Sequence, residues 1–170
     1  RFLADSIFLA KVKNSLAIVD VDVTQYDIIF IAGGWGAAYD LGYSTELGEK
    51  ITEAYYADKQ AVIGGVCHGV LGLIKAKDRD GNLLIAGRRM TGVTDKQIKE
   101  LGIIDITPQH PEAELRKAGV IFESQTAFRD LFATHVVVDD EERFVTGQNQ
   151  NSGHETAQKM MAIVAKNSML

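Results

Sequence analysis

The sequence is short of several features, and each shortage argues against a class of protein. One cysteine in 170 residues rules out a disulfide within the chain and fits a reducing, cytoplasmic location. The four histidines are scattered, so no group of histidine and cysteine has the spacing of a zinc site. We therefore expect no metal or other cofactor. No stretch approaches the roughly 18 consecutive apolar residues of a membrane-spanning helix, and we expect no membrane partner.

Positive charge is also in the minority. Lysine and arginine number 18 against 23 acidic residues, for a net charge of −5. Because phosphate binding draws on clustered basic side chains, this balance argues against nucleic acid as a partner. The hydrophobic content of 46% is that of an ordinary globular protein. A chain of this length predicts one domain, which we assign to residues 1–170.

Strand-like and helix-like segments alternate along the chain. The apolar runs 26–32 and 61–66 are typical of strands buried on both faces. A helix capped by Thr45 is expected between them, and a second is expected from His68 to about Ala76. The pattern predicts an α/β domain of the flavodoxin-like kind, with a mostly parallel sheet and helices on both faces.

The second half continues the alternation. We expect a strand at 88–93, a helix at 95–101, a helix from Pro111 to a stop at Gly119, and a strand at 120–124. Residues 135–147 predict a hairpin across an acidic turn. The final helix is expected to start with a capping box at Ser152 and to place Ala157, Met160, Met161 and Val164 on one face.

The lone cysteine lies in the stretch "AVIGGVCHGVLG". Gly65-Val66-Cys67-His68-Gly69 is G-x-C-x-G between a predicted strand and a predicted helix, which is the thiol form of a nucleophile elbow. Such a turn presents the side chain at the carboxyl end of the sheet, where open α/β folds bind ligands. The helix start should also lower the pKa of the thiol. The alternative is a buried cysteine that only fills space.

Three motifs together resemble the ThiJ/PfpI superfamily, whose members have the class I glutamine amidotransferase-like fold. They are "GGVCHG" after a valine-rich strand, the turn "IAGGWG" with Tyr39-Asp40-Leu41, and the segments "RRMTGVTD" and "RFVTGQNQNSG" that each precede a helix. The adjacent cysteine and histidine resemble the branch that contains heat-shock chaperones described as glyoxalase III. The resemblance covers the chain from about Phe2 onward.

The resemblance implies roles for particular residues. Cys67 matches the nucleophile and His68 its acid/base partner. Backbone N–H groups near Gly34, Trp35 and Gly36 and at His68 would form an oxyanion hole and substrate pocket. Trp35 stands where the branch usually has histidine, which makes that wall more apolar.

The acid that would orient the histidine does not match. In the branch it lies a few residues after a Thr-Asp pair, and Thr94-Asp95 is followed at that position by Ile98. Asp95 and Glu100 are the candidates that remain, each with the alternative of a helix cap or a solvated surface charge. A triad without the acid can still work, because the acid makes no bond.

His110-Pro111-Glu112 imitates the His-Pro-Glu of true glutamine amidotransferases. It lies closer to Cys67 in sequence than such motifs do, and it suits a helix start, which we favour.

Superfamily members also carry an N-terminal strand–helix unit with a glutamate beside the cysteine, and nothing before Phe30 matches it. We expect the native protein to be longer, or a second chain to complete the fold. A homodimer is a further expectation from the family.

The main functional prediction is a cysteine-dependent, glutathione-independent glyoxalase of the glyoxalase III or D-lactate dehydratase type, a lyase acting on a small carbonyl substrate. Cys67 would attack a 2-oxoaldehyde and His68 would move protons, giving a 2-hydroxy acid. Two alternatives remain. A holding chaperone or stress protein would keep its activity without the thiol, and a cysteine peptidase or amidase would use the same pair on acyl substrates.

Overall fold

A four-stranded sheet forms the centre of the protein. The computed structural model describes residues 6–169. Its main sheet has the order β1 (Ile28–Ile31), β2 (Val62–Val66), β6 (Phe144–Gly147) and β5 (Val136–Val138). The first three strands are parallel, and β5 runs antiparallel beside β6 as the predicted hairpin. A small parallel sheet joins β3 (Arg89–Met90) to β4 (Ile121–Phe122). The predicted mostly parallel α/β sheet is confirmed.

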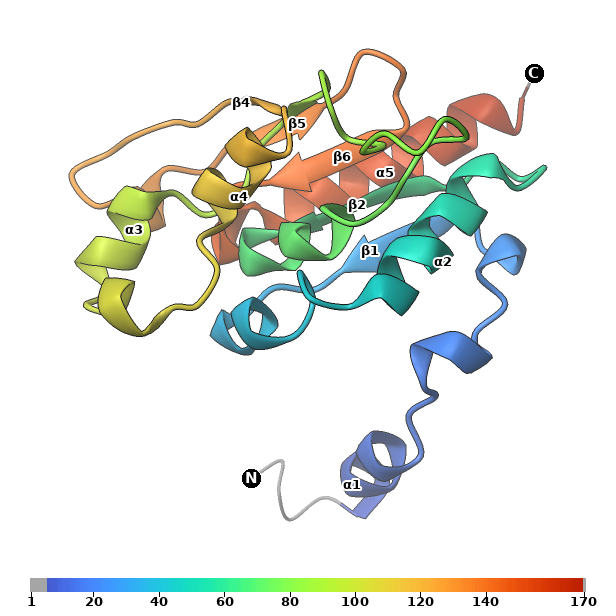
Figure 1. Ribbon diagram of the computed structural model, residues 1–170, viewed down its shortest axis with the longest axis horizontal. Helices are drawn as coiled ribbons and strands as arrows, with labels where there is room; N and C mark the ends of the chain where they lie inside the picture. Colours follow the sequence, from blue (N-terminus) through green and yellow to red (C-terminus); the bar gives the residue numbers. More distant parts are fainter. Residues whose placement is uncertain (1–5, 170) are drawn as a thin grey trace.

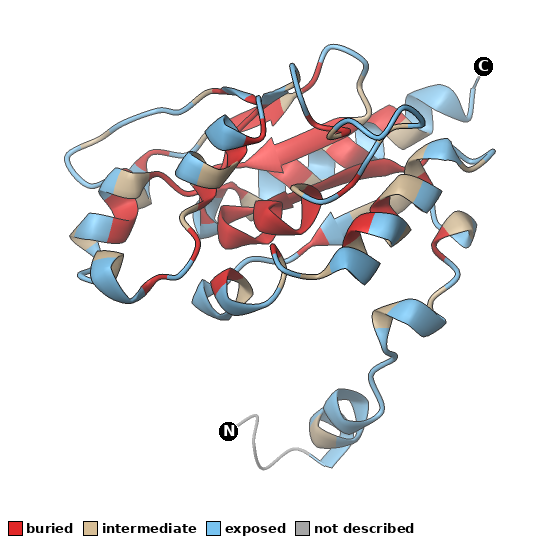
Figure 2. Cartoon of the chain, in the orientation of Figure 1, coloured by how far each residue is buried: buried red, intermediate tan, exposed pale blue. Residues whose placement is uncertain are grey.

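Helices cover both faces of the main sheet (Figure 1). On one face Ile63 of β2 packs in a core with Ile51 of α2 (Thr45–Tyr56). On the other face the next side chain along β2, Val62, packs with Met160 and Ile163 of α5 (Gly153–Asn167). Successive side chains of a strand point to opposite faces, so a strand apolar at every position has to be covered on both. All five residues of β2 are buried, and Figure 2 shows the buried residues concentrated in this layer.

The remaining helices lie around this core. They are α1 (Ser6–Lys13), α3 (Asp95–Glu100), α4 (Pro111–Lys117) and the 3₁₀ helices η2 (Ile18–Asp20), η3 (Val23–Gln25), η4 (Trp35–Tyr39), η5 (Cys67–Leu73), η6 (Ile104–Ile106), η7 (Asp130–Phe132) and η8 (Gln150–Ser152). In Figure 1 α1 stands away from the sheet, and none of its residues is buried. Among residues 6–169, no helix combines the length and apolar character needed to cross a membrane.

Several helix ends follow the sequence and two do not. Pro111 begins α4, and Gly119 follows its end with a φ of 84°, as predicted. The cap of α2 is Ser44, whose Oγ accepts from the Leu47 N–H at 3.0 Å, so the assignment to Thr45 is wrong by one residue. The capping box at Ser152 is also wrong, because η8 already gives Ser152 a helical backbone and its Oγ accepts from the N–H of His135.

Other segments are shorter or oriented differently than the pattern predicts. The helix expected from His68 to about Ala76 is the 3₁₀ helix η5, which ends at Leu73. The strand expected at 88–93 pairs only at Arg89–Met90. In α5, Met160 is buried, but Met161 is 55% exposed and lies off the predicted apolar face.

Candidate active site

The turn after β2 has the geometry of a nucleophile elbow. Strand β2 ends at Val66, and Cys67 has a φ of 58°, one of three non-glycine residues with positive φ among those described. That backbone conformation costs an L-residue about 1–3 kcal/mol and persists only where the surroundings enforce it. The turn therefore holds Cys67 at the carboxyl end of the parallel strands.

Two glycines let the chain close tightly around this turn. A Cβ at Gly69 would lie 2.4 Å from the carbonyl oxygen of Ile31, and a Cβ at Gly33 would lie 2.9 Å from the Cβ of Cys67. Neither contact is possible between real atoms, so η5 and the turn after β1 approach each other as closely as they do because both positions lack a side chain. The structure explains why the sequence has glycine on both sides of the cysteine and in the turn facing it.

Cys67 and His68 form a buried pair. The Cys67 Sγ lies 3.4 Å from Nδ1 of His68, close enough for the thiol to donate to the ring. Only 8% of Cys67 and 2% of His68 is exposed. On a regular helix adjacent side chains diverge. At this strained elbow they meet, which the sequence alone could only suggest.

Burial keeps both members of the pair neutral. It raises the pKa of the Cys67 thiol, although the backbone N–H groups of His68 and Gly34 hydrogen-bond to the sulfur and lower it. The expectation of a lowered thiol pKa from the helix start is wrong, because burial outweighs the two amides. Burial, and then the charge of His110, lower the pKa of His68 to about 4. At neutral pH the resting pair is a thiol beside an uncharged imidazole.

The glycine turn after β1 forms the wall that faces the cysteine. Gly34 caps η4 with a φ of 121° and aims its N–H at the sulfur. Trp35 and Gly36 follow inside η4. The Trp35 indole N–H donates to Thr107 Oγ1 at 3.0 Å, and its ring packs edge-on against Tyr39. The indole N–H of Trp35 therefore binds a segment that is distant in the sequence.

The structure places no carboxylate next to His68. Among residues 6–169, no acidic side chain pairs with it. Asp95 instead lies 3.6 Å from Nδ1 of His110, and Glu100 accepts from the Asp130 N–H at 2.9 Å. Ile98 is fully buried in a cluster with Cys67. An aliphatic side chain thus packs where the resemblance implied the acid, and a catalytic role for Asp95 or Glu100 stays a prediction.

Segment 103–110, which joins α3 to α4, closes over this end of the sheet. It is attached to η4 at Trp35 and again at Tyr39, whose hydroxyl donates to the carbonyl of Ile106 at 2.7 Å. His110 lies at its end, directly before α4. Sequence reasoning favoured a helix start for His110 over an amidotransferase motif. Its contacts with Ile104 and Asp95 depend on how α3 and α4 pack, which no local pattern reports.

One nitrogen of the pair is left without a partner. Six buried side-chain atoms of the described residues lack a hydrogen-bond partner, and Nε2 of His68 is one of them. The others belong to Thr91, Asp95, Gln97, Gln109 and Arg143. Buried polar groups are normally paired, so the free nitrogen of His68 needs an explanation, and a role in chemistry supplies one.

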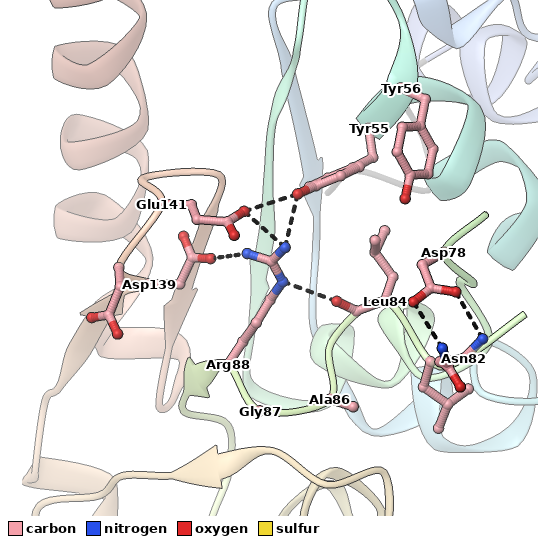
Figure 3. Close-up of a pocket in the computed structure, with 12 residues that line it drawn as sticks. Tyr55, Tyr56, Asp78, Asn82, Leu84, Ala86, Gly87, Arg88, Asp139 and Glu141 are labelled. Carbon is pink, nitrogen blue, oxygen red and sulfur yellow. Dashed lines mark hydrogen bonds and ion pairs between the residues drawn. The ribbon is translucent and has the colours of Figure 1, made fainter. Parts of the chain in front are cut away.

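A cavity lies at the opposite end of the sheet, where β2 and β6 begin (Figure 3). It has a volume of about 510 Å³. Arg88 in its wall donates to Tyr55, Asp139, Glu141 and the carbonyl of Leu84. Every charged group of this cluster has its partner inside the protein. It fastens the β5–β6 hairpin to α2, and we assign it a structural role.

This chain belongs to the DJ-1/PfpI family, whose model matches residues 8–163. Among solved structures it is similar to the Rapid Encystment Protein 24 KDa of Francisella tularensis, with a TM-score of 0.84 and 31% identity over 96% of this chain and 69% of the other. It is also similar to glyoxalase III of Candida albicans, with a TM-score of 0.76 and 31% identity over 93% of this chain and 65% of the other.

Curated relatives point to the same branch. The chain is 30% identical to "Glyoxalase 3" of Candida albicans over 93% of its own length and 66% of the relative. It is 30% identical to "Glutathione-independent glyoxalase HSP31" of Saccharomyces cerevisiae over 88% of its length and 61% of that relative. The chain therefore spans about two thirds of the curated relatives that it matches. The family predicted from the elbow and the glycine turn is confirmed.

Proposed function

We propose that this protein is a glutathione-independent glyoxalase, a lyase that converts a 2-oxoaldehyde such as methylglyoxal into the 2-hydroxy acid. One observation carries the proposal: the contact of 3.4 Å between Cys67 Sγ and His68 Nδ1 on the strained elbow. Relatives that share this branch are named for that activity. A thiol in the protein takes the part that free glutathione would otherwise play.

The first step uses the pair as it stands. Neutral His68 accepts the proton of the Cys67 thiol as sulfur bonds to the aldehyde carbon of the substrate. The carbonyl π bond breaks, and its electrons move to the carbonyl oxygen. The backbone N–H groups of Gly34 and His68, which already converge on the sulfur, lie close to where that negative charge develops. Return of the proton from His68 gives a neutral hemithioacetal.

The second step is an internal redox exchange. His68 removes hydrogen from the former aldehyde carbon as a proton and delivers a proton to the adjacent carbon, while the hydroxyl proton of the hemithioacetal passes to the neighbouring carbonyl oxygen. The first carbon is oxidised to a thioester and the second is reduced to an alcohol, so no external electron acceptor is needed. Water then cleaves the thioester, which frees the Cys67 thiol and releases the 2-hydroxy acid. Overall, one substrate and one water give one 2-hydroxy acid.

Glutathione-free turnover tests this proposal. We expect purified protein to convert methylglyoxal to lactate, and we expect Cys67→Ala and His68→Gln to lose the activity, since one removes the bond-forming atom and the other the proton carrier. His154→Gln, on the exposed side of α5, is the matched control and should keep the full rate. Failure of intact wild-type protein to form lactate overturns the proposal. Hydrolysis of acyl substrates, or aggregation suppression that survives Cys67→Ala, would then support the peptidase or the chaperone.

We also propose that the outer edge of β1 is covered in the assembled protein by a second chain or a further segment. Among residues 6–169, β1 pairs only with β2, and its Phe30 is 38% exposed. An open edge strand with apolar side chains is normally covered. Light scattering should find a dimer, or a longer native polypeptide should show protection of the β1 amides from hydrogen exchange. A monomer with unprotected β1 amides contradicts this proposal.

We propose a cytoplasmic location for the protein, because a nucleophilic thiol stays reduced there. Cell fractionation with an antibody to the native protein would test this location, and recovery outside the cytoplasmic fraction would refute it.

A further inference from the structure

Another cavity lies beside the one in Figure 3, against the end of α2 and the turn that follows it. Its volume is about 370 Å³, and its wall includes Tyr55 and Tyr56, which also line the first cavity. Arg79 and Arg143 bring two positive charges to the wall, and Asp58 brings one negative charge. A cavity of this volume has room for a small molecule.

The two arginines of this cavity are not neutralised by the chain. Among residues 6–169 neither Arg79 nor Arg143 forms an ion pair, whereas Arg88 in the neighbouring cavity forms two. Those two pairs use the carboxylates of Asp139 and Glu141, whose charges also act on Arg143. Burial nevertheless lowers the pKa of Arg143, because the two carboxylates do not fully compensate for the loss of water.

Arg143 also has unused hydrogen-bond donors. Its Nη2 donates to the backbone carbonyls of Tyr55 at 2.7 Å and of Ala61 at 3.3 Å. Its Nε is buried without a hydrogen-bond partner, and no acceptor among the described residues binds Nη1. A guanidinium offers five N–H donors, and buried donors are normally paired. The remaining donors of Arg143 therefore call for an acceptor that residues 6–169 do not provide.

Two tyrosine rings hold the guanidinium groups in place. The guanidinium of Arg143 lies 4.2 Å from the centre of the Tyr55 ring, and that of Arg79 lies 4.6 Å from the centre of the Tyr56 ring. The two rings contact each other edge to face, with their centres 5.0 Å apart. Stacking uses the face of a guanidinium and leaves the N–H groups at its edge free. The positive charges are therefore positioned before a ligand arrives, which lowers the entropic cost of binding.

The charge and size of the cavity indicate the class of ligand. A guanidinium binds phosphate or carboxylate oxygens through parallel hydrogen bonds. Two guanidinium groups favour a doubly charged ligand, and a phosphomonoester carries roughly −1.5 to −2 charges at pH 7. Asp58 opposes an anion, but it is a single exposed charge. The cavity also has room for more than the phosphate, beside the Tyr56 ring, which is 37% exposed.

We propose that Arg79 and Arg143 form a binding site for a small molecule with a phosphomonoester group. The guanidinium groups bind the phosphate, and the body of the ligand packs against Tyr56. Arg143 is bonded to the carbonyl of Ala61, directly before β2 begins, whereas Cys67 follows the end of that strand. The site is thus separate from the Cys67–His68 pair, and the proposal does not depend on the glyoxalase function.

Calorimetric titration of the full chain with phenyl phosphate tests the site. Phenyl phosphate should bind several-fold more tightly than inorganic phosphate, which lacks the body, or benzoate, which lacks the second charge. Arg79→Met should weaken its binding by about tenfold or more, and Asp58→Asn should tighten it. Lys59→Met is the matched control, because it removes a positive charge that pairs with Asp27 outside the cavity, and it should leave the affinity unchanged.

Each other outcome overturns a stated part of the proposal. Equal affinities in Arg79→Met and Lys59→Met would overturn the site, because only non-specific attraction would then act. Inorganic phosphate or benzoate binding as tightly as phenyl phosphate would overturn the phosphomonoester class. Arg79 is exposed, so its substitution tests binding without disturbing the carbonyls that Arg143 holds. Cys67→Ala should bind phenyl phosphate like wild type, and loss of binding in that variant would move the ligand to the active site and refute the separate site.

Discussion

The two ends of the parallel sheet differ in how their buried polar groups are hydrogen-bonded. Where β2 and β6 begin, Arg88 is surrounded by acceptors, and its partner Asp139 also accepts from the backbone N–H groups of Arg143 and Phe144. Where β2 ends, Nε2 of His68 is buried without a hydrogen-bond partner. The first arrangement contributes stability, and the second leaves groups free for chemistry.

A search for cavities alone would have pointed to the other end. The cavity of about 510 Å³ belongs to the Arg88 cluster, whereas Cys67, the proposed nucleophile, is only 8% exposed. A pocket whose guanidinium and carboxylates already have partners has little charge left to offer a ligand. Incomplete pairing, combined with a strained backbone at Cys67, is the better guide to function in this protein.

The largest expected effect comes from two substitutions of the nucleophile. Cys67→Ala and Cys67→Gly should each lower glyoxalase activity by at least about 10³-fold. They should differ in stability, with the glycine variant about 1 kcal/mol more stable than alanine, because glycine adopts the φ of 58° without strain. Denaturant unfolding of both variants measures the difference. An alanine variant more stable than glycine would contradict the strained elbow.

Substitution of Arg88, at the end of the sheet where β2 and β6 begin, should lower stability without lowering activity. Arg88→Met leaves Asp139 buried without its guanidinium and should lower the free energy of unfolding by about 3 kcal/mol. The rate per folded molecule should stay at the wild-type value. Arg89→Met is the matched control, since Arg89 pairs with the more exposed Glu123 and Asp140 and should cost about 1 kcal/mol or less. Equal losses of unfolding free energy in Arg88→Met and Arg89→Met would contradict a special stabilising role for Arg88.

The pH dependence of the free energy of unfolding should reveal the lowered pKa of His68. Its pKa is about 4 in the folded protein and 6.5 when unfolded. Between these values the unfolded chain binds a proton that the folded chain does not, so stability is complete above pH 6.5 and falls as the pH drops towards 4. The loss should be about 3 kcal/mol. Unfolding of wild type and His68→Gln at several pH values measures it, and parallel curves for the two proteins would refute the buried neutral ring.

The smallest expected effect on stability comes from breaking the hydrogen bond between Trp35 and Thr107. Thr107→Val removes the hydroxyl that accepts from Trp35 and donates to Ile103, at a cost of about 1 kcal/mol. Because Ile103 and Ile104 of segment 103–110 pack against the cluster that contains Cys67, we expect kcat/KM to fall several-fold. Thr45→Val, on the exposed start of α2, controls for the loss of a hydroxyl. A change in kcat/KM no larger than in that control would show that the hydrogen bond does not position the segment.

Local patterns were enough to predict the central features. Apolar runs and glycines located β1, β2 and the elbow, because a strand buried on both faces and a tight turn each leave a short signature in sequence. The neutral state of both Cys67 and His68 could not be predicted from the sequence. The thiol pKa depends on whether burial, which raises it, outweighs the two backbone amides, which lower it, and burial depends on everything packed around the pair. Ser152 shows the reverse error, because its motif was present but its hydroxyl accepts from His135 instead.

Trapping of the covalent intermediate is the most direct test of the central claim, that Cys67 is the nucleophile. Wild-type protein is mixed with methylglyoxal and quenched before turnover is complete, and it is then mapped by peptide mass spectrometry. The account predicts one adduct on Cys67, which competes with alkylation of the thiol by iodoacetamide. Lactate formation by Cys67→Ala at the wild-type rate, with no adduct on Cys67 in wild type, would contradict it.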